Sequence, residues 1–159
     1  MEVGEVMTTQ VQSCAPEDSI EFAARIMWDH DCGCLPVCTG GDGRAHTVGL
    51  VTDRDICMCA MFEHAPLSEL RVGQAMTRHV LGCQPDDSLE QAERVMQDGR
   101  VRRLPVLSAA GDLLGMISLA DLAREAKREG SNRILGRDSA ASNVGHTLAA
   151  ICAPLVPGS

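Results

Sequence analysis

The chain has 159 residues, enough for one domain or two small modules that share an interface, and its formal net charge at pH 7 is -8. That charge argues against nonspecific binding to nucleic acid or to anionic membranes, because both rely on a positive field. No apolar run reaches the roughly 18 residues that cross a bilayer. The opening residues also lack the basic start and apolar core of a signal peptide, so we expect a cytoplasmic protein without a membrane or nucleic-acid partner.

The charge is unevenly divided along the chain. Residues 1–69 carry three Arg and twelve Asp or Glu, which gives -9, whereas residues 70–159 carry eleven Lys or Arg and ten acids, which gives +1. We therefore expect a small anionic ligand to prefer the second half.

Apolar spacing predicts a first set of elements up to about residue 60. A short strand at 11–14 leads through Pro and acids to a helix that Asp18 opens, with Glu21 at its third position in a capping-box pattern. The stretches "CLPVC" and "TVGLVT" predict two strands joined by a Gly-containing turn, and a second helix follows Thr52. The expected order is β-α-β-β-α.

The same elements recur in the second half, where a strand at 80–83 and a helix opened by Asp87, with Glu90, are expected. At an offset of 69 residues, Met7-Thr8 matches Met76-Thr77 and Leu35-Pro36-Val37 matches Leu104-Pro105-Val106. After a loop that is shorter in the second copy the offset becomes 66, and "GLVT" with Asp55 matches "GMIS" with Asp121. The chain is therefore a duplicated supersecondary unit.

This duplication sets the expected organisation. We expect an α+β fold of two β-α-β-β-α repeats that pack together with pseudo-two-fold symmetry. The first repeat with its linker spans 1–69 and the second spans 70–127. Residues 128–159 begin with a polar, Gly/Ser-rich segment that we expect to be mobile, and end in an apolar tail that we expect to dock on the body or on a partner subunit.

The turn "TDRD" is the strongest candidate for ligand chemistry. Thr52 precedes a helix whose first backbone N–H groups suit a phosphate, and the Asp55 carboxylate can accept two hydrogen bonds from a ribose diol. Gly49 leaves space beside the strand for a planar base, and Gly115, Ser118 and Asp121 repeat the arrangement. The alternative is a helix cap that needs no ligand. Duplication of the glycine favours the ligand interpretation.

The Met-Thr starts, the Leu-Pro-Val strands and the sequences "GLVTDRD" and "GMISLAD" resemble a tandem pair of CBS (cystathionine-β-synthase) domains, or Bateman module, and the small stand-alone actinobacterial type in particular. The resemblance covers residues 1 to about 127. It implies an adenosyl ligand such as AMP, ATP or S-adenosylmethionine in the cleft between repeats, and two-fold pairing into a disc-shaped dimer. It further implies that Asp55 and Asp121 bind ribose, that Thr52 and Ser118 face phosphate, and that Leu35 and Leu104 flank the base.

The second copy has arginines at positions 100, 102 and 103, where the first has Asp31, Gly33 and Cys34. Arg100 and Arg103 are thus expected to supply countercharge for a polyphosphate. The alternative is that these arginines are solvated or paired with Asp86, Asp87 or Glu90.

The eight cysteines contain no CxxC pair and match no common zinc template, so we expect no metal site and no bound cofactor. Cys57 and Cys59 point about 200° apart on one helix, and packing is the favoured interpretation for both and for Cys32 and Cys34. Cys14 and Cys38 end strands of the first repeat and are the candidate disulfide pair, within or between chains.

Catalysis finds little support, because no nucleophile sits beside a recognisable base. We therefore expect a regulatory ligand sensor that is not an enzyme. The alternative is a structural or interaction dimer with an empty cleft and redox-responsive cysteines. A two-fold homodimer is expected to bury apolar helix residues, namely Phe22, Ile26, Ile56, Cys59 and Ala60.

Overall fold

The computed structural model describes residues 1–40, 45–132 and 139–152, and their contacts divide the chain into two compact units. The first unit holds the described residues of Gln10–Val80 together with Ser108–Leu113. The second unit holds Met1–Thr9, Leu81–Leu107 and the described residues from Leu114 on. The start of the chain therefore packs with the second repeat rather than with the first, so the compact units do not follow the repeat boundaries.

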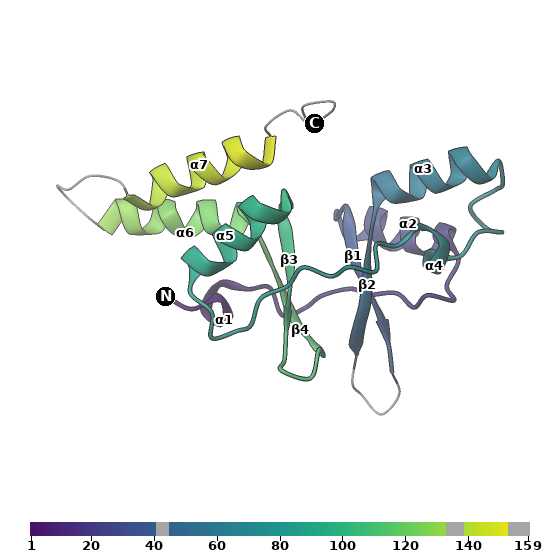
Figure 1. Ribbon diagram of the computed structural model, residues 1–159, viewed down its shortest axis with the longest axis horizontal. Coiled ribbons are helices and arrows are strands. Elements are labelled where there is room, and N and C mark those ends of the chain that lie inside the picture. The colour runs from purple at the N-terminus through teal and green to yellow at the C-terminus, as the bar shows by residue number, and fades with distance from the viewer. Residues whose placement is uncertain (41–44, 133–138, 153–159) are drawn as a thin grey trace. The chain divides into compact units, whose positions relative to one another are not determined.

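The first unit combines helices with a two-stranded sheet (Figure 1). Its elements are α2 (Ile20–Asp29), β1 (Cys34–Thr39), β2 (His46–Thr52), α3 (Asp53–Glu63) and the short α4 (Val72–Ala75). Strands β1 and β2 are antiparallel, with Leu35 opposite Val51. Beside β2, the main chains of Leu50 and Thr77 exchange hydrogen bonds of 3.0 and 2.8 Å. The segment before α2 thus lies along one edge of β1, and the segment after α4 lies along the free edge of β2.

The second unit repeats this plan. Its elements are α1 (Val3–Val6), α5 (Leu89–Gly99), β3 (Arg103–Leu107), β4 (Leu113–Ser118), α6 (Leu119–Asn132) and α7 (Ser139–Cys152). Here Thr8 and Met116 exchange two main-chain hydrogen bonds of 2.9 Å, as Thr77 and Leu50 do in the first unit. The α+β class and the duplication are confirmed. None of the helices in the described ranges has the length and apolar character needed to span a membrane.

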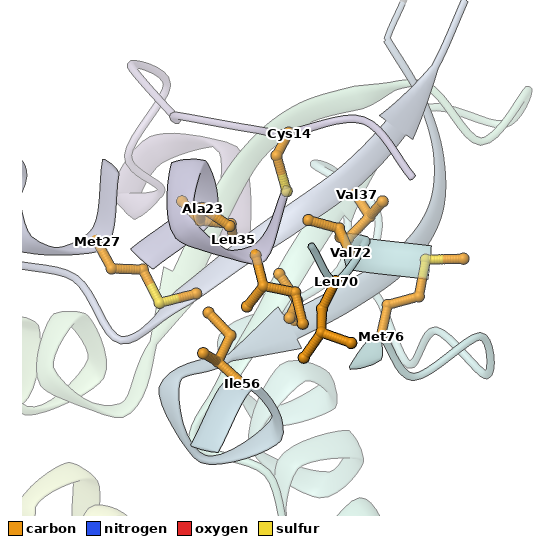
Figure 2. Close-up of a cluster of buried hydrophobic side chains, with 11 residues drawn as sticks. Cys14, Ala23, Met27, Leu35, Val37, Ile56, Leu70, Val72 and Met76 are labelled. Carbon is orange, nitrogen blue, oxygen red and sulfur yellow. The ribbon is translucent and has the colours of Figure 1, made fainter. Parts of the chain in front are cut away.

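Each unit has its own apolar core, and Figure 2 shows that of the first. Helix α2, strand β1, helix α3 and the segment around α4 supply its buried side chains, among them Ala23, Met27, Leu35, Val37, Ile56, Leu70, Val72 and Met76. The second core contains Val3, Ala92, Met96, Leu104, Val106, Ile117 and Leu122. Val3 and Val72 are equivalent positions in the two repeats, so the short helices α1 and α4 each contribute a buried side chain to one of the two cores.

The strands expected at 11–14 and 80–83 are not formed. Each is reduced to one parallel bridge, between Cys14 and Val37 in the first unit and between Cys83 and Val106 in the second. Cys14 donates its N–H to the Pro36 carbonyl at 3.1 Å. The next bond of a parallel ladder in that direction would need the N–H of Pro36, which proline lacks, so the pairing stops after one residue.

The helices expected to open at Asp18 and Asp87 begin one residue later. Ser19 is the N-cap of α2, and its hydroxyl accepts a hydrogen bond from the N–H of Phe22 at 3.1 Å. Asp18 instead accepts from the N–H of Ala15 at 2.7 Å, which closes the preceding turn. Ser88 likewise caps α5, and the capping box there uses Gln91 in place of the expected Glu90. The aspartates belong to the turns because their carboxylates reach backward along the chain.

The polar segment expected to be mobile from residue 128 is helical in its described parts. Helix α6 continues to Asn132 and α7 begins at Ser139, while 133–138 and 153–159 lie outside the described residues. Helix α7 packs against α5 and α6, with Val144 and Ile151 against the second core (Figure 1). Gln97 of α5 donates to the buried hydroxyl of Thr147 at 2.7 Å. The described part of the tail therefore docks on its own chain.

Candidate ligand-binding turns

The turn at the start of α3 is a closed capping box. The Thr52 hydroxyl donates to Oδ2 of Asp55 at 2.7 Å and accepts from the Asp55 N–H at 3.2 Å. The Thr52 N–H donates to the same carboxylate oxygen at 2.9 Å. Every element of the capping interpretation is therefore present. The hydroxyl proton of Thr52 is already used, so a phosphate could receive it only by displacing Asp55.

The backbone N–H groups of this first turn also have acceptors. The Asp53 N–H donates to the Gly33 carbonyl at 3.3 Å, and the Arg54 N–H donates to the Asp53 carboxylate at 2.8 Å. These are the groups expected to receive a phosphate. What remains is the second carboxylate oxygen of Asp55, Oδ1, to which no other group in the described part of the chain donates. The turn thus offers a fixed, half-buried acceptor rather than an open phosphate cradle.

The turn at the start of α6 has the same cap with one addition. Oδ2 of Asp121 accepts from the Ser118 hydroxyl at 2.6 Å and from the Ser118 N–H at 2.8 Å. Oδ1 of Asp121 accepts from the guanidinium of Arg124, three residues on, in an ion pair. Asp121 is only 7% exposed. The two turns therefore differ at Oδ1, which accepts a hydrogen bond in Asp121 but, among the described residues, not in Asp55.

The expectation that Gly49 leaves room for a base is wrong. A Cβ on Gly49 would lie 2.9 Å from the Thr77 carbonyl oxygen and 2.9 Å from Sδ of Met76. A Cβ on Gly115 would lie 2.8 Å from the Thr8 carbonyl oxygen and 2.7 Å from Sδ of Met7. Both glycines are required by a neighbouring strand that approaches the main chain closely. Their duplication therefore follows from packing and no longer favours a ligand.

Leu35 and Leu104, expected to flank a base, are buried in the two cores, at 1% and 0% exposure. A base could touch them only after the cores had repacked. The arginines at 100, 102 and 103 are all exposed, and none forms an ion pair within the described ranges. The alternative of pairing with Asp86, Asp87 or Glu90 is not observed there. These arginines remain available to an anion.

The comparison with known proteins identifies the two sequence repeats. The CBS domain family matches residues 3–60 and 72–128. The chain belongs to the CBS domain family. The CBS domain-containing protein YhcV of Bacillus subtilis is 33% identical over 144 residues, which are 91% of this chain and 95% of that protein. Hypoxic response protein 1 of Mycobacterium tuberculosis is 31% identical over 120 residues, 76% of this chain and 81% of that protein.

Two solved structures of CBS proteins bear on ligands. The crystal structure of CBSX2 in complex with AMP has a TM-score of 0.70 and 26% identity, and covers 81% of this chain and 98% of its own. A crystal structure of hypoxic response protein I holds two coordinated zinc ions, with a TM-score of 0.67 and 29% identity over 78% of this chain and 98% of its own. Within the described CBS repeats here, no group of three or more His, Cys, Asp or Glu is placed to hold a metal.

Cys14 and Cys38 of the first CBS repeat lie on neighbouring segments and are not bonded to each other in this structure. The Cys38 N–H donates to the Cys14 carbonyl at 2.8 Å, while the two sulfurs face the Pro36 carbonyl (4.0 Å) and the Thr47 hydroxyl (3.8 Å). Burial, helped by the negative charge of Asp18, raises the pKa of Cys14 from 9.0 to about 12, and burial raises that of Cys38. A disulfide between them stays a prediction, and their thiols are poor nucleophiles at neutral pH.

The expected packing of the other cysteines is confirmed in part. Cys32 and Cys59 pack against the first core. Cys57 is exposed, so its interpretation as a packed residue is wrong. Around the axis of α3 it lies about 100° from Ile56 and about 160° from Cys59, both of which contact the core. Cys83 of the second repeat is buried, and burial followed by the charge of Asp87 raises its pKa to about 12.

These raised pKa values predict an alkaline loss of stability. Above pH 9 the unfolded chain releases the protons of Cys14 and Cys83 while the folded chain keeps them up to about pH 12. Because the unfolded state then binds fewer protons, the free energy of unfolding falls by up to about 1.4 kcal/mol per pH unit for each thiol. The chain has no Tyr, so thiols dominate titration just above pH 9.

Urea unfolding at pH 8, 9, 10 and 10.5 measures this slope. The double variant Cys14→Ala/Cys83→Ala is expected to flatten it, and the exposed Cys57→Ala is the matched control. An equal slope in wild type and in the double variant would show that these two thiols are not responsible.

Proposed function

We propose that the chain is a non-catalytic sensor whose CBS repeats bind an adenosyl ligand such as AMP, ATP or S-adenosylmethionine. The observation that carries the proposal is the free Oδ1 of Asp55, on a carboxylate that Thr52 holds in place through Oδ2. A carboxylate oxygen can accept hydrogen bonds from vicinal hydroxyls, and the N-terminal end of α3 stabilises its negative charge. The AMP complex of CBSX2 supports an adenosyl ligand.

The second repeat contributes the remaining candidate contacts. Ser118 and Asp121 repeat the cap chemistry at the start of α6. Arg100 and Arg103 are exposed and can neutralise a phosphate. A partner protein would then bind the ligand-occupied and the ligand-free forms of the chain with different affinities, as expected of a regulatory module.

Calorimetric titration with AMP, ATP and S-adenosylmethionine tests the proposal. At least one of the three is expected to bind the wild type, and Asp55→Asn is expected to weaken that ligand by about 1.5 to 3 kcal/mol, since it replaces a charged acceptor by a neutral amide. Asparagine can still accept from the Thr52 N–H, so the cap should persist. Glu63→Gln, at the exposed far end of the same helix, removes the same charge and should leave affinity unchanged. Failure of all three ligands to bind would refute the proposal.

We propose further that two chains pair through α2 and α3 of the first unit. These two packed helices carry five large apolar side chains that are substantially exposed: Phe22, Trp28 (87%), Met58, Met61 and Phe62 (69%). Of the residues expected in the interface, Ile56 is buried in its own core, and Ile26, Cys59 and Ala60 pack against it. Phe22 alone remains exposed. The exposed apolar area on α2 and α3 supports an interface there.

The second repeat shows how such a helix pair is covered. Trp28 corresponds by the 69-residue offset to Gln97, whose side chain bonds Thr147 of α7. Helix α7 thus covers α5 and α6, whereas no element of the described chain covers the outer side of Trp28. Trp28, which stands where the second repeat has Gln97, would be stabilised by contact with an apolar surface. The same surface of a second chain is apolar and can make that contact.

A further inference from the structure

We infer that the two turns are not equivalent: the first-repeat turn binds an adenosyl compound that carries no phosphate, and Arg124 prevents the second-repeat turn from binding a second ribose. This inference rests on the proposed adenosyl function and specifies its ligand class and stoichiometry. It follows from a comparison of matching positions in the duplicated sequence.

The first difference is the state of the carboxylate. In both turns Oδ2 accepts from the capping hydroxyl and from its N–H. Oδ1 of Asp121 also accepts from Arg124, whereas no described residue outside the cap donates to Asp55. The residue that corresponds to Arg124 is Met58, by the 66-residue offset, and a thioether cannot donate. A ribose diol can therefore reach Oδ1 of Asp55 directly, but at Asp121 it would have to displace an ion pair from a buried acid.

The second difference is the residue after the capping hydroxyl. Asp53 follows Thr52, and its carboxylate takes the Arg54 N–H at 2.8 Å. Leu119 follows Ser118, and its side chain cannot accept a hydrogen bond. The acid in the first turn thus occupies an amide that a phosphate at a helix N-terminus would use.

Charge acts in the same direction. The first turn, 52–55, contains Asp53, Arg54 and Asp55, which gives -1. In the second turn, the positive charge of Arg124 balances the negative charge of Asp121. The Leu119 N–H also donates to the Arg102 carbonyl at 2.9 Å, so the main chain of Arg102 lies at the start of α6. A phosphate dianion is therefore repelled from the first turn, while a neutral nucleoside or a sulfonium nucleoside is not.

The test compares adenosine with AMP, two probes that differ only in the phosphate, by calorimetry on the full chain. For the wild type we expect one adenosine per chain, bound at least about 10-fold more tightly than AMP. Asp55→Asn should weaken adenosine by about 10-fold or more, and Asp121→Asn by less than about 3-fold. Arg124→Met, which copies Met58 into the second turn, should add a second adenosine site. Asp53→Leu, which copies Leu119 into the first turn, should bring AMP to within about 3-fold of adenosine.

Three results would overturn the inference while leaving the proposed function standing: tighter binding of AMP than of adenosine, two adenosine sites in the wild type, or an equal loss from Asp55→Asn and Asp121→Asn. No binding of adenosine, AMP, ATP or S-adenosylmethionine to the wild type would refute the function itself. Thermal melts by circular dichroism check each variant, and Glu63→Gln serves again as the charge-matched control. Because Arg124→Met predicts a gain of a site, a misfolded variant cannot imitate the expected result.

Discussion

Gly49→Ala is expected to lower the free energy of unfolding by about 2 to 3 kcal/mol. The added Cβ would stand 2.9 Å from the Thr77 carbonyl oxygen, which is main chain and takes part in the pairing with Leu50. Relief of this contact requires the two main chains to separate, which stretches both of their hydrogen bonds. Gly115→Ala should cost a similar amount, because the Thr8 carbonyl oxygen lies 2.8 Å from the corresponding Cβ position.

Urea unfolding followed by far-ultraviolet circular dichroism measures these losses. Fluorescence is less suitable because Trp28, the single Trp, is already 87% exposed when folded. Gly145→Ala is the matched control, since nothing lies within 4 Å of its Cβ position in helix α7. There the same substitution should be neutral or stabilising by up to about 1 kcal/mol. A stable Gly49→Ala variant would mean that the glycine is not held by strand packing, and would reopen the question of a bound base.

Trp28→Glu is expected to raise the dissociation constant of the proposed dimer by about 30-fold or more, because a Trp that becomes buried in an interface commonly contributes about 2 kcal/mol or more. Phe62→Glu should act in the same direction with a smaller effect. Both side chains are mostly exposed, at 87% and 69%, so neither change should disturb the core of the first unit.

Sedimentation velocity at micromolar concentration distinguishes the outcomes. The wild type should sediment as two chains and Trp28→Glu as one. Leu148→Glu supplies the control, because Leu148 is 46% exposed on α7 in the second unit, outside the proposed interface. A wild-type mass of one chain contradicts the pairing, and dissociation by Leu148→Glu equal to that by Trp28→Glu would place the interface elsewhere.

The repeated landmarks were sufficient to predict the family and the helix-strand-strand-helix order of each repeat, although not the absence of its first strand, because each landmark reports a local requirement. Leu35-Pro36-Val37 occupies a buried strand with Pro near its start, and Thr52 with Asp55 closes a helix cap. Contacts between distant segments were harder to predict. The approach of Thr77 to Gly49 joins residues far apart in the sequence, so a glycine held by packing resembled one kept for a ligand.

Accessibility at the candidate site was equally hard to predict from the sequence. The order of residues does not show that the Thr52 hydroxyl donates to Asp55, that the Arg54 N–H donates to Asp53, or that Leu35 is buried. Spacing did contain one unused signal. Arg124 lies three residues after Asp121, a separation at which helix side chains meet, and the first copy has Met58 there.

Helix α7 has a consequence for the size of the assembly. A duplicated protein with the same apolar interaction surface on both repeats could bind one neighbouring chain through each repeat. Heterologous contacts of this kind can add chains without limit. Here α7 seals that surface on the second repeat, and the proposed contact on α2 and α3 is left without an equivalent. Pairing through a single self-complementary surface closes after two chains. In the proposed dimer, helix α7 would therefore limit the assembly to two chains, because the described part of the second repeat presents no equivalent apolar surface to a third chain.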